Sequence, residues 1–330
     1  MWMKKWAAAV LFAAAGGMSG AAEAQTKLNF TTPYPEKLFH VINIREFIKD
    51  VHERSGGKIE ITLHTAESLF KHADTMQAIR SGQVDLAELQ LTQFANQDEL
   101  YNFEALPFLA TNYDDTMKIW EAAKPFVEKR VGRDRVRILY TVPWPPQAFY
   151  AKRPLRAIED MKGLKFRVYN RIGARMAELF QAQPVLVGGG EVPQAFATGM
   201  IDSMITSSAF GASVKAWDFV DHFNDVQAWL GMNQILINER TYQRLTPEQR
   251  DIFMAAAKAA GERGLRLSKE ANDAEKKVLA ANGIKVLEPT PEFMAAARRI
   301  ARPLVDDWAK AVGDDGKAIL AKYEELAKSK

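Results

Sequence analysis

The sequence predicts an α/β protein of two units, and three observations predict it. Short apolar segments of strand length alternate with segments whose apolar residues recur at helical spacing. The alternation is interrupted by a proline cluster at residues 143–146 and then resumes. The chain of 330 residues, 47% of them hydrophobic, is long enough to form two cores. This order of elements favours a largely parallel sheet in each unit, with residues 143–147 as the crossover.

The first unit precedes the prolines. Its strands are predicted from alternating or continuous apolar residues at 28–31, 58–64, 84–89 and 136–142. Its helices are predicted over 41–51, 73–81 and 115–131. A glycine follows each helix, at Gly56, Gly82 and Gly132, and glycine most readily adopts the left-handed conformation found at helix ends.

The second unit follows the prolines and repeats the alternation. Its strands are predicted at 147–151, 165–169, 184–187 and 203–207. Its helices are predicted over 173–180 and 191–198.

A long helix is predicted later in the chain. Thr246 is a good N-cap, Pro247 fits the first helical position, and glutamine three residues after the threonine completes a capping box. Helical patterning then continues to Ala281, which gives about 35 residues or roughly 50 Å at 1.5 Å per residue. Such a helix is too long for one small unit. Two helices broken near Gly261 or Gly264 are an equal alternative.

The first residues resemble an export signal. Lys4 and Lys5 precede an apolar segment at residues 6–18, and Ala22-Glu23-Ala24 fits a signal peptidase site before Gln25. The apolar segment is shorter than the roughly 20 residues of a membrane-spanning helix. The sequence therefore predicts a signal peptide at residues 1–24 and a periplasmic protein without membrane insertion after cleavage.

Charge and cysteine content exclude several functions. Removing the signal peptide lowers the formal net charge from +3 to +2, and the charges are interspersed, so no basic surface for nucleic acid is expected. The sequence has no cysteine, which excludes disulfides and thiol chemistry.

Catalytic motifs are weak. His64 and His72 do not have a metal-ligand spacing, and we interpret them as surface or turn residues. The glycines at 188–190 follow a predicted strand but lack the lysine and hydroxyl of a phosphate-binding loop. We therefore predict neither an enzyme nor a cofactor.

Several segments, taken in order, resemble one family. They are 56–61, 82–86, 106–108, 160–168 and 191–202. The segment 160–168 contains Lys-Gly-Leu-Lys followed by an apolar-Arg-apolar strand. Over nearly the whole mature chain, the sequence resembles the solute-binding proteins of TRAP transporters, the DctP family.

This resemblance implies a two-lobe fold like that of periplasmic binding proteins, with a hinge and a long bracing helix. Lobe 1 would comprise 25–146 and 232–275, and lobe 2 would comprise 147–231 and 276–330. It also implies a small organic carboxylate as ligand and the TRAP membrane subunits as partners. An aromatic or short aliphatic monocarboxylate is favoured.

Arg167 occupies the position at which the family pairs an arginine with the ligand carboxylate. A guanidinium is planar, permanently charged and able to bind a carboxylate with two parallel hydrogen bonds. The alternative is that Arg167 pairs with a carboxylate of the protein.

Further ligand contacts are expected from polar and aromatic residues. The alternative for each polar residue is an ordinary place in a loop or at a strand end, and the alternative for each aromatic residue, which is favoured for any single one, is core packing. The polar candidates are Asn170, Gln147, Gln90, Thr206 and Ser207. The aromatic candidates are Tyr34, Trp144 and Phe210. Gln147 and Gln90 stand where sialic-acid-binding relatives carry arginine and glutamate, which argues against that sugar.

Two other functions are considered. A binding protein of an ATP-driven importer would share the lobes but lack the long bracing helix. An exported α/β enzyme acting on a small acid would show a nucleophile with its base, or a metal, in the cleft.

Overall fold

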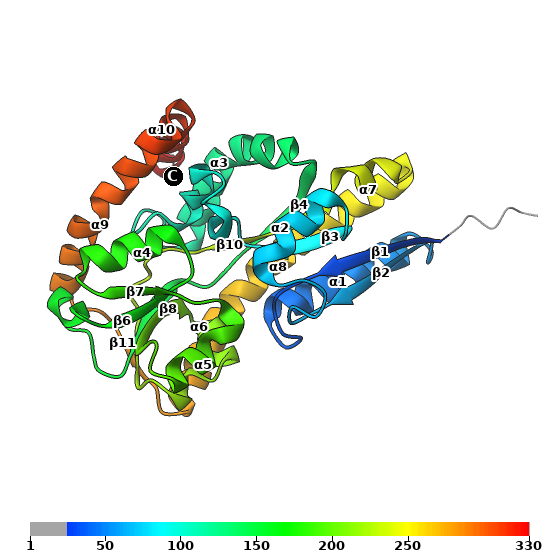
Figure 1. Ribbon diagram of the computed structural model, residues 1–330. Helices are drawn as coiled ribbons and strands as arrows, with labels where there is room; N and C mark the ends of the chain where they lie inside the picture. Colours follow the sequence, from blue (N-terminus) through cyan, green and yellow to red (C-terminus); the bar gives the residue numbers. More distant parts are fainter. Residues whose placement is uncertain (1–24, 330) are drawn as a thin grey trace, which may run out of the picture.

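The computed structural model describes residues 25–329, and the predicted signal peptide lies outside the described residues. The chain forms two α/β lobes, each built around its own sheet (Figure 1). The residues before the proline cluster form most of the first lobe and those after it form the second, but the first sheet also takes a later strand at Met232–Asn238.

The first lobe contains a five-stranded sheet in the order β2-β1-β3-β10-β4. Its strands are β1 (Thr26–Thr31), β2 (Ile59–His64), β3 (Leu86–Leu89), β4 (Val136–Pro143) and β10 (Met232–Asn238). Its helices are α1 (Phe39–Arg54), α2 (His72–Ser81), α3 (Tyr113–Arg133) and α7 (Glu239–Arg244). Successive residues of β10 enter different cores, Ile235 with the α1 side and Leu236 with the α2 and α3 side, so both faces of the sheet are buried.

The second lobe contains a six-stranded sheet in the order β11-β9-β5-β8-β6-β7. Its strands are β5 (Gln147–Ala151), β6 (Lys165–Val168), β7 (Gln183–Leu186), β8 (Ser203–Ser207), β9 (His222–Asn224) and β11 (Lys285–Leu287). Its short helices are α4 (Arg171–Leu179), α5 (Val192–Ala197) and α6 (Ser208–Ser213).

The prediction of largely parallel sheets is wrong for one strand in each lobe. β10 runs antiparallel to β3 and β4, and β5 runs antiparallel to β8 and β9. These are the two strands that the chain enters directly after crossing between the lobes. Parallel pairing needs a long crossover connection, usually a helix, and neither crossing contains one of the helices that cover the sheets.

The long helix α8 (Pro247–Ala281) is continuous, so the alternative of two broken helices is wrong. Its N-terminus has the predicted capping box at Thr246. Gly264 serves close packing instead, because a Cβ atom there would lie 2.5 Å from Cγ2 of Val142 on β4. Gly264 therefore lets the helix approach the first sheet closely.

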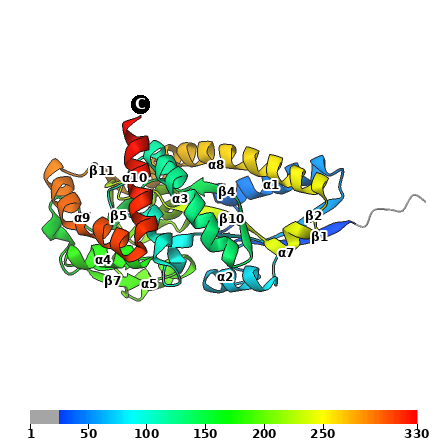
Figure 2. The ribbon, with the colours of Figure 1, turned by 90° about the horizontal axis from the view of Figure 1, so that it is seen from above.

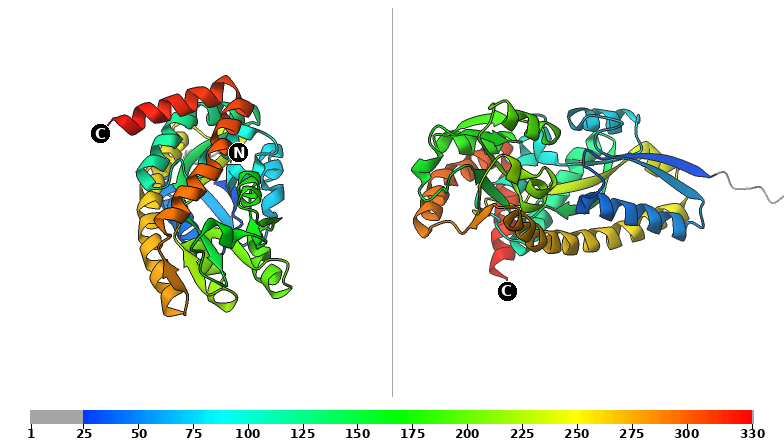
Figure 3. Two further views of the ribbon diagram at one scale, coloured as in Figure 1. Left: turned by 90° about the vertical axis from the view of Figure 1, so that its left-hand side faces the viewer. Right: turned by 90° about the horizontal axis from the view of Figure 1, so that it is seen from below.

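Helix α8 runs along one side of both lobes (Figures 2 and 3). In the first lobe, Nδ2 of Asn43 donates to the carbonyl of Ala260 at 3.0 Å. In the second lobe, the ammonium of Lys276 pairs with the carboxylate of Asp225, whose side chain is only 2% exposed. The helix is thus attached to both lobes by buried polar contacts as well as by apolar packing.

Two further helices, α9 (Pro291–Val312) and α10 (Asp314–Lys328), end the chain. Helix α9 packs on α4 of the second lobe, whereas α10 packs on α3 of the first lobe (Figure 1). Arg130 of α3 donates to Asp315 of α10 at 2.8 Å. Among the described residues, no helix is long and apolar enough to cross a membrane.

Candidate functional site

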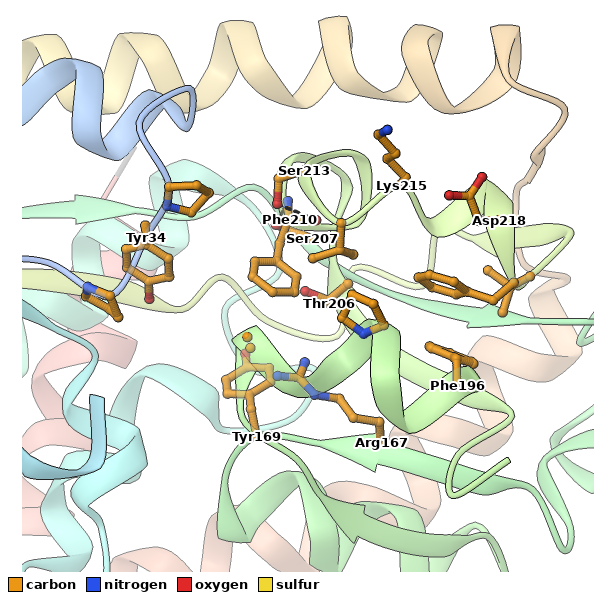
Figure 4. Close-up of a pocket in the computed structure, with 18 of the residues that line it drawn as sticks. Tyr34, Arg167, Tyr169, Phe196, Thr206, Ser207, Phe210, Ser213, Lys215 and Asp218 are labelled. Atoms are coloured by element: carbon orange, nitrogen blue, oxygen red, sulfur yellow. Dashed lines mark hydrogen bonds between the residues drawn. The ribbon is translucent and has the colours of Figure 1, made fainter. Parts of the chain in front are cut away.

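A cavity of about 1080 Å³ lies between the lobes. Its wall includes residues just after β1, β3 and β4 in the first lobe, and residues on β5, β6 and β8 in the second (Figure 4). β1, β3, β6 and β8 all belong to parallel pairs, and the carboxyl ends of such strands are the usual place for ligands in open α/β sheets.

Arg167 lies on β6, and its guanidinium points toward the cavity beside Tyr169 (Figure 4). The side chain is held by main-chain carbonyl groups. Its Nε donates to Val187 at 3.0 Å, and its Nη1 donates to Ile205 at 3.2 Å. These two bonds fix the orientation of the guanidinium plane without neutralising its charge.

Within residues 25–329, Arg167 makes no ion pair with a carboxylate, although it is only 3% exposed. Burial disfavours the charged form and lowers the pKa of Arg167 to about 10, a shift that the phenol groups of Tyr169 and Tyr34 partly oppose. The guanidinium is still charged at neutral pH. A buried cation without an anion is energetically unfavourable, so this site is suited to an anion from outside the chain.

Aromatic rings form a continuous arc along the cavity. The rings of Tyr34 and Trp144 lie 5.1 Å apart, and the rings of Trp144 and Phe210 lie 6.4 Å apart. The guanidinium carbon of Arg167 lies 5.8 Å from the centre of the Phe210 ring. The arc therefore links a first-lobe aromatic wall with the cation of the second lobe.

The two glutamines of the cavity are tied into polar contacts. Gln147 donates from Nε2 to the carbonyl of Pro145 at 3.1 Å and accepts from the hydroxyl of Tyr169 at 3.2 Å. Gln90 accepts a 3.3 Å hydrogen bond from Gln93. Each amide is therefore fixed in orientation while part of its hydrogen-bonding capacity remains free.

The hydroxyls of Thr206 and Ser207 differ in role. Both residues end β8 and line the cavity. Ser207 caps α6, because its Oγ accepts from the backbone N–H of Phe210 at 3.1 Å. Thr206 has no hydrogen bond from its side chain to another described residue, which leaves this hydroxyl available to a ligand.

Asn170 is the predicted contact that the structure does not bring to the cavity wall. It caps α4 instead, accepting from the N–H of Gly173 at 2.7 Å. The other eight predicted residues all line the cavity.

His72 and Tyr169 are among the cavity residues that were not predicted. His72 is not simply a surface or turn residue, because its ring contacts Tyr34 and Phe94 at centroid distances of 6.3 and 6.0 Å. Burial lowers the pKa of His72 to about 4, although the carboxylates of Glu67 and Glu88 oppose the shift. The only signal for Tyr169 in the sequence is its position two residues after Arg167, at the end of the strand predicted over 165–169.

The described part of the chain contains no cluster of three metal-ligating side chains. A cavity between two lobes, with a fixed cation and aromatic and amide walls, defines a two-lobe solute receptor. A continuous helix braces both lobes, as the resemblance to TRAP solute-binding proteins implies. The family model for bacterial extracellular solute-binding proteins of family 7, DctP, matches residues 33–311, and the chain belongs to this family of TRAP transporter receptors.

Solved structures share the fold along nearly the whole chain. DctP6, a Bordetella pertussis extracytoplasmic solute receptor binding pyroglutamic acid, is 41% identical, with a TM-score of 0.89 over 91% of this chain and 100% of that chain. A marine metagenome TRAP solute-binding protein specific for pyroglutamate is 35% identical, with a TM-score of 0.89 over 92% and 99% of the two chains. The sialic acid-binding periplasmic protein SiaP of Vibrio cholerae is 22% identical over 79% of this chain and 81% of its own length.

Proposed function

We propose that this protein is a periplasmic receptor that captures pyroglutamate, or a close analogue, for a TRAP transporter. The observation that carries the proposal is the buried guanidinium of Arg167, which faces the cavity without a carboxylate partner among the described residues. The choice of acid is supported by relatives of 41% and 35% identity that bind pyroglutamate. Pyroglutamate is a single acid, whereas the sequence favoured a broader class, the aromatic or short aliphatic monocarboxylates.

The chemistry of the cavity suits this ligand. Pyroglutamate carries one carboxylate and a lactam amide on a small ring whose other atoms are apolar. Arg167 binds the carboxylate, and Thr206, Gln147 and Gln90 supply donors and acceptors for the lactam. The ring carbons lie against the aromatic arc, which removes apolar surface from water.

Closure of the lobes completes the site. Arg167 and Thr206 belong to the second lobe, whereas Tyr34 and Gln90 belong to the first, so a ligand held between them makes more contacts when the lobes approach. The two moving bodies follow the expected division, 25–146 with 232–275 and 147–231 with 276–330, except that α10 packs on α3 and moves with the first lobe. The closed surface then delivers the acid to the membrane subunits.

Calorimetric titration of the mature chain, residues 25–330, tests this function. Pyroglutamate is expected to bind with a Kd of about 1 µM or tighter. Proline, whose ring nitrogen is a charged ammonium, is expected to bind at least roughly a hundredfold more weakly, because the cavity already holds a buried cation. Succinate and sialic acid serve as further comparisons. Binding of one of these acids without binding of pyroglutamate would show that the assigned ligand is wrong.

A further inference from the structure

The two aromatic residues of the first-lobe wall turn their polar atoms away from the cavity. The hydroxyl of Tyr34 donates to Oδ1 of Asn233 at 3.3 Å, and the indole Nε1 of Trp144 donates to the same oxygen at 2.8 Å. Both rings line the cavity, whereas Asn233 does not. One buried acceptor behind the wall therefore binds the polar groups of both rings.

Asn233 is itself held from the opposite side. Its Nδ2 donates to Oε1 of Glu88 at 2.7 Å, and Oε2 of Glu88 accepts from the hydroxyl of Thr32 at 2.5 Å. Nδ1 of His40 lies 3.2 Å from Oε1 of the same carboxylate. Asn233, Glu88 and Thr32 are all fully buried, at 0% exposure. The bonds to Glu88 fix which end of the amide faces the rings, because only the NH₂ group can donate to the carboxylate.

We propose that Asn233 is a positioning residue that determines ligand specificity by keeping this wall of the cavity apolar. The proposal rests on the proposed function. With their donors bound to Asn233, Tyr34 and Trp144 offer the ligand only ring surface. Every hydrogen bond to the ligand then comes from other cavity residues such as Arg167 and Thr206.

The energetics make this arrangement sensitive to Asn233. A buried donor that loses its acceptor destabilises the fold, and removing Oδ1 leaves two such donors. The rings can recover the loss by rotating so that the hydroxyl and the indole N–H reach water in the cavity. That rotation places polar groups where the ring carbons of the ligand lie, and it therefore opposes binding.

The test compares pyroglutamate binding by the wild-type chain and by Asn233→Ala, with calorimetry well below the melting temperature of each. We expect the Kd of Asn233→Ala to rise roughly tenfold or more, because each 1.4 kcal/mol corresponds to a factor of ten. We also expect the preference for pyroglutamate over proline to decrease. An unchanged Kd and preference in a folded Asn233→Ala variant would overturn the proposal.

Asn238→Ala is the matched control. Asn238 lies on the same strand, is also buried, and donates to the carbonyl of Ile79, away from the cavity. Its loss should lower the melting temperature without changing the Kd. In a double-mutant cycle, Asn233→Ala should raise the Kd less in a Tyr34→Phe background, since one of the two freed donors is then absent. Additive effects would contradict the proposed coupling.

A measurement without ligand separates this proposal from the ligand assignment. The indole N–H of Trp144, assigned by loss of its NMR signal in Trp144→Phe, should exchange slowly with solvent in the wild type and quickly in Asn233→Ala. Equal exchange in both proteins would overturn the proposed positioning. Failure of the wild-type chain to bind pyroglutamate, with the difference in exchange present, would refute the ligand assignment and not the role of Asn233 in holding the rings.

Discussion

The Nε of Arg167 donates to the main-chain carbonyl of Val187 at 3.0 Å, on the segment that follows β7. This bond and the second one, to Ile205, hold the guanidinium by neutral groups only. The cation is thus positioned before any ligand arrives, and no carboxylate within residues 25–329 has to be displaced from it. Because the site is already ordered, less unfavourable free energy of ordering opposes ligand binding.

The buried charge of Arg167 has no carboxylate partner in the described part of the chain, so it should make the ligand-free protein less stable than a variant with an apolar side chain at this position. We expect Arg167→Met to leave the free energy of unfolding unchanged or to raise it by up to about 2 kcal/mol, because an apolar side chain avoids the desolvation of the cation. Arg130→Met is the contrasting variant, since Arg130 pairs with Asp98 and Asp315 at 2.8 Å each. The free energy of unfolding of Arg130→Met should fall by about 1–2 kcal/mol. Urea unfolding without ligand measures the free energy of unfolding of both variants. A larger decrease for Arg167→Met than for Arg130→Met would contradict this explanation.

The two glycines of α8 should respond differently to alanine. A Cβ at Gly264 would lie 2.5 Å from Val142, whereas the nearest atom to a Cβ at Gly261 is 3.6 Å away, on Tyr140. Gly264→Ala should therefore destabilise the protein by about 1–3 kcal/mol through overpacking. Gly261→Ala should be neutral or stabilise by up to about 1 kcal/mol through helix propensity. Thermal unfolding of the two variants checks this, and equal effects would show that α8 does not contact β4 as described.

Acid should weaken the fold through His72. The folded protein holds the pKa of His72 at about 4 by burial, below the usual value of 6.5, so only the unfolded chain takes up the proton between these values. This contribution to stability is fully present above pH 6.5 and is lost progressively as the pH falls from 6.5 to 4. Between pH 7 and pH 4.5, the free energy of unfolding of His72→Phe should therefore fall by about 2 kcal/mol less than that of the wild type. If urea unfolding shows the same pH dependence for the wild type and for His72→Phe, this role of His72 is wrong.

Removing the partner of Asp225 should be costly. Lys276→Met leaves a carboxylate that is 2% exposed without its cation at the junction of α8 with the second lobe. We expect a loss of about 3 kcal/mol in the free energy of unfolding. The double variant with Asp225→Asn should recover much of it, because the buried charge is gone. A similar loss in single and double variants would argue against an ionic contact.

The local elements could be predicted from the sequence because their signals are local. The capping box at Thr246 lies within one helical turn, Gly82 follows α2 directly, and Gly56 follows α1 after one residue. Arg167 was found through a family resemblance and not through its own pattern. Whether Arg167 has a carboxylate partner depends on all the side chains that surround it in the fold. No local sequence pattern encodes those neighbours.

Long-range contacts account for what the sequence did not reveal. Tyr34 and Asn233 are 199 residues apart in the chain, and their bond exists only because β10 returns from the second lobe to the first sheet. The antiparallel direction of β10 has the same origin. His72 likewise enters the cavity because α2 packs on β3, which places its ring against Tyr34 and Phe94.

Titration of pyroglutamate into Arg167→Lys tests the central claim most directly. Lysine keeps the charge but not the planar pair of donors, so the Kd should rise at least roughly tenfold. Arg175→Lys is the matched control, because Arg175 lies on α4 at the surface and pairs with Asp307 at 2.8 Å. It should bind as the wild type does. Wild-type affinity in Arg167→Lys would contradict the claim that this guanidinium receives the ligand carboxylate.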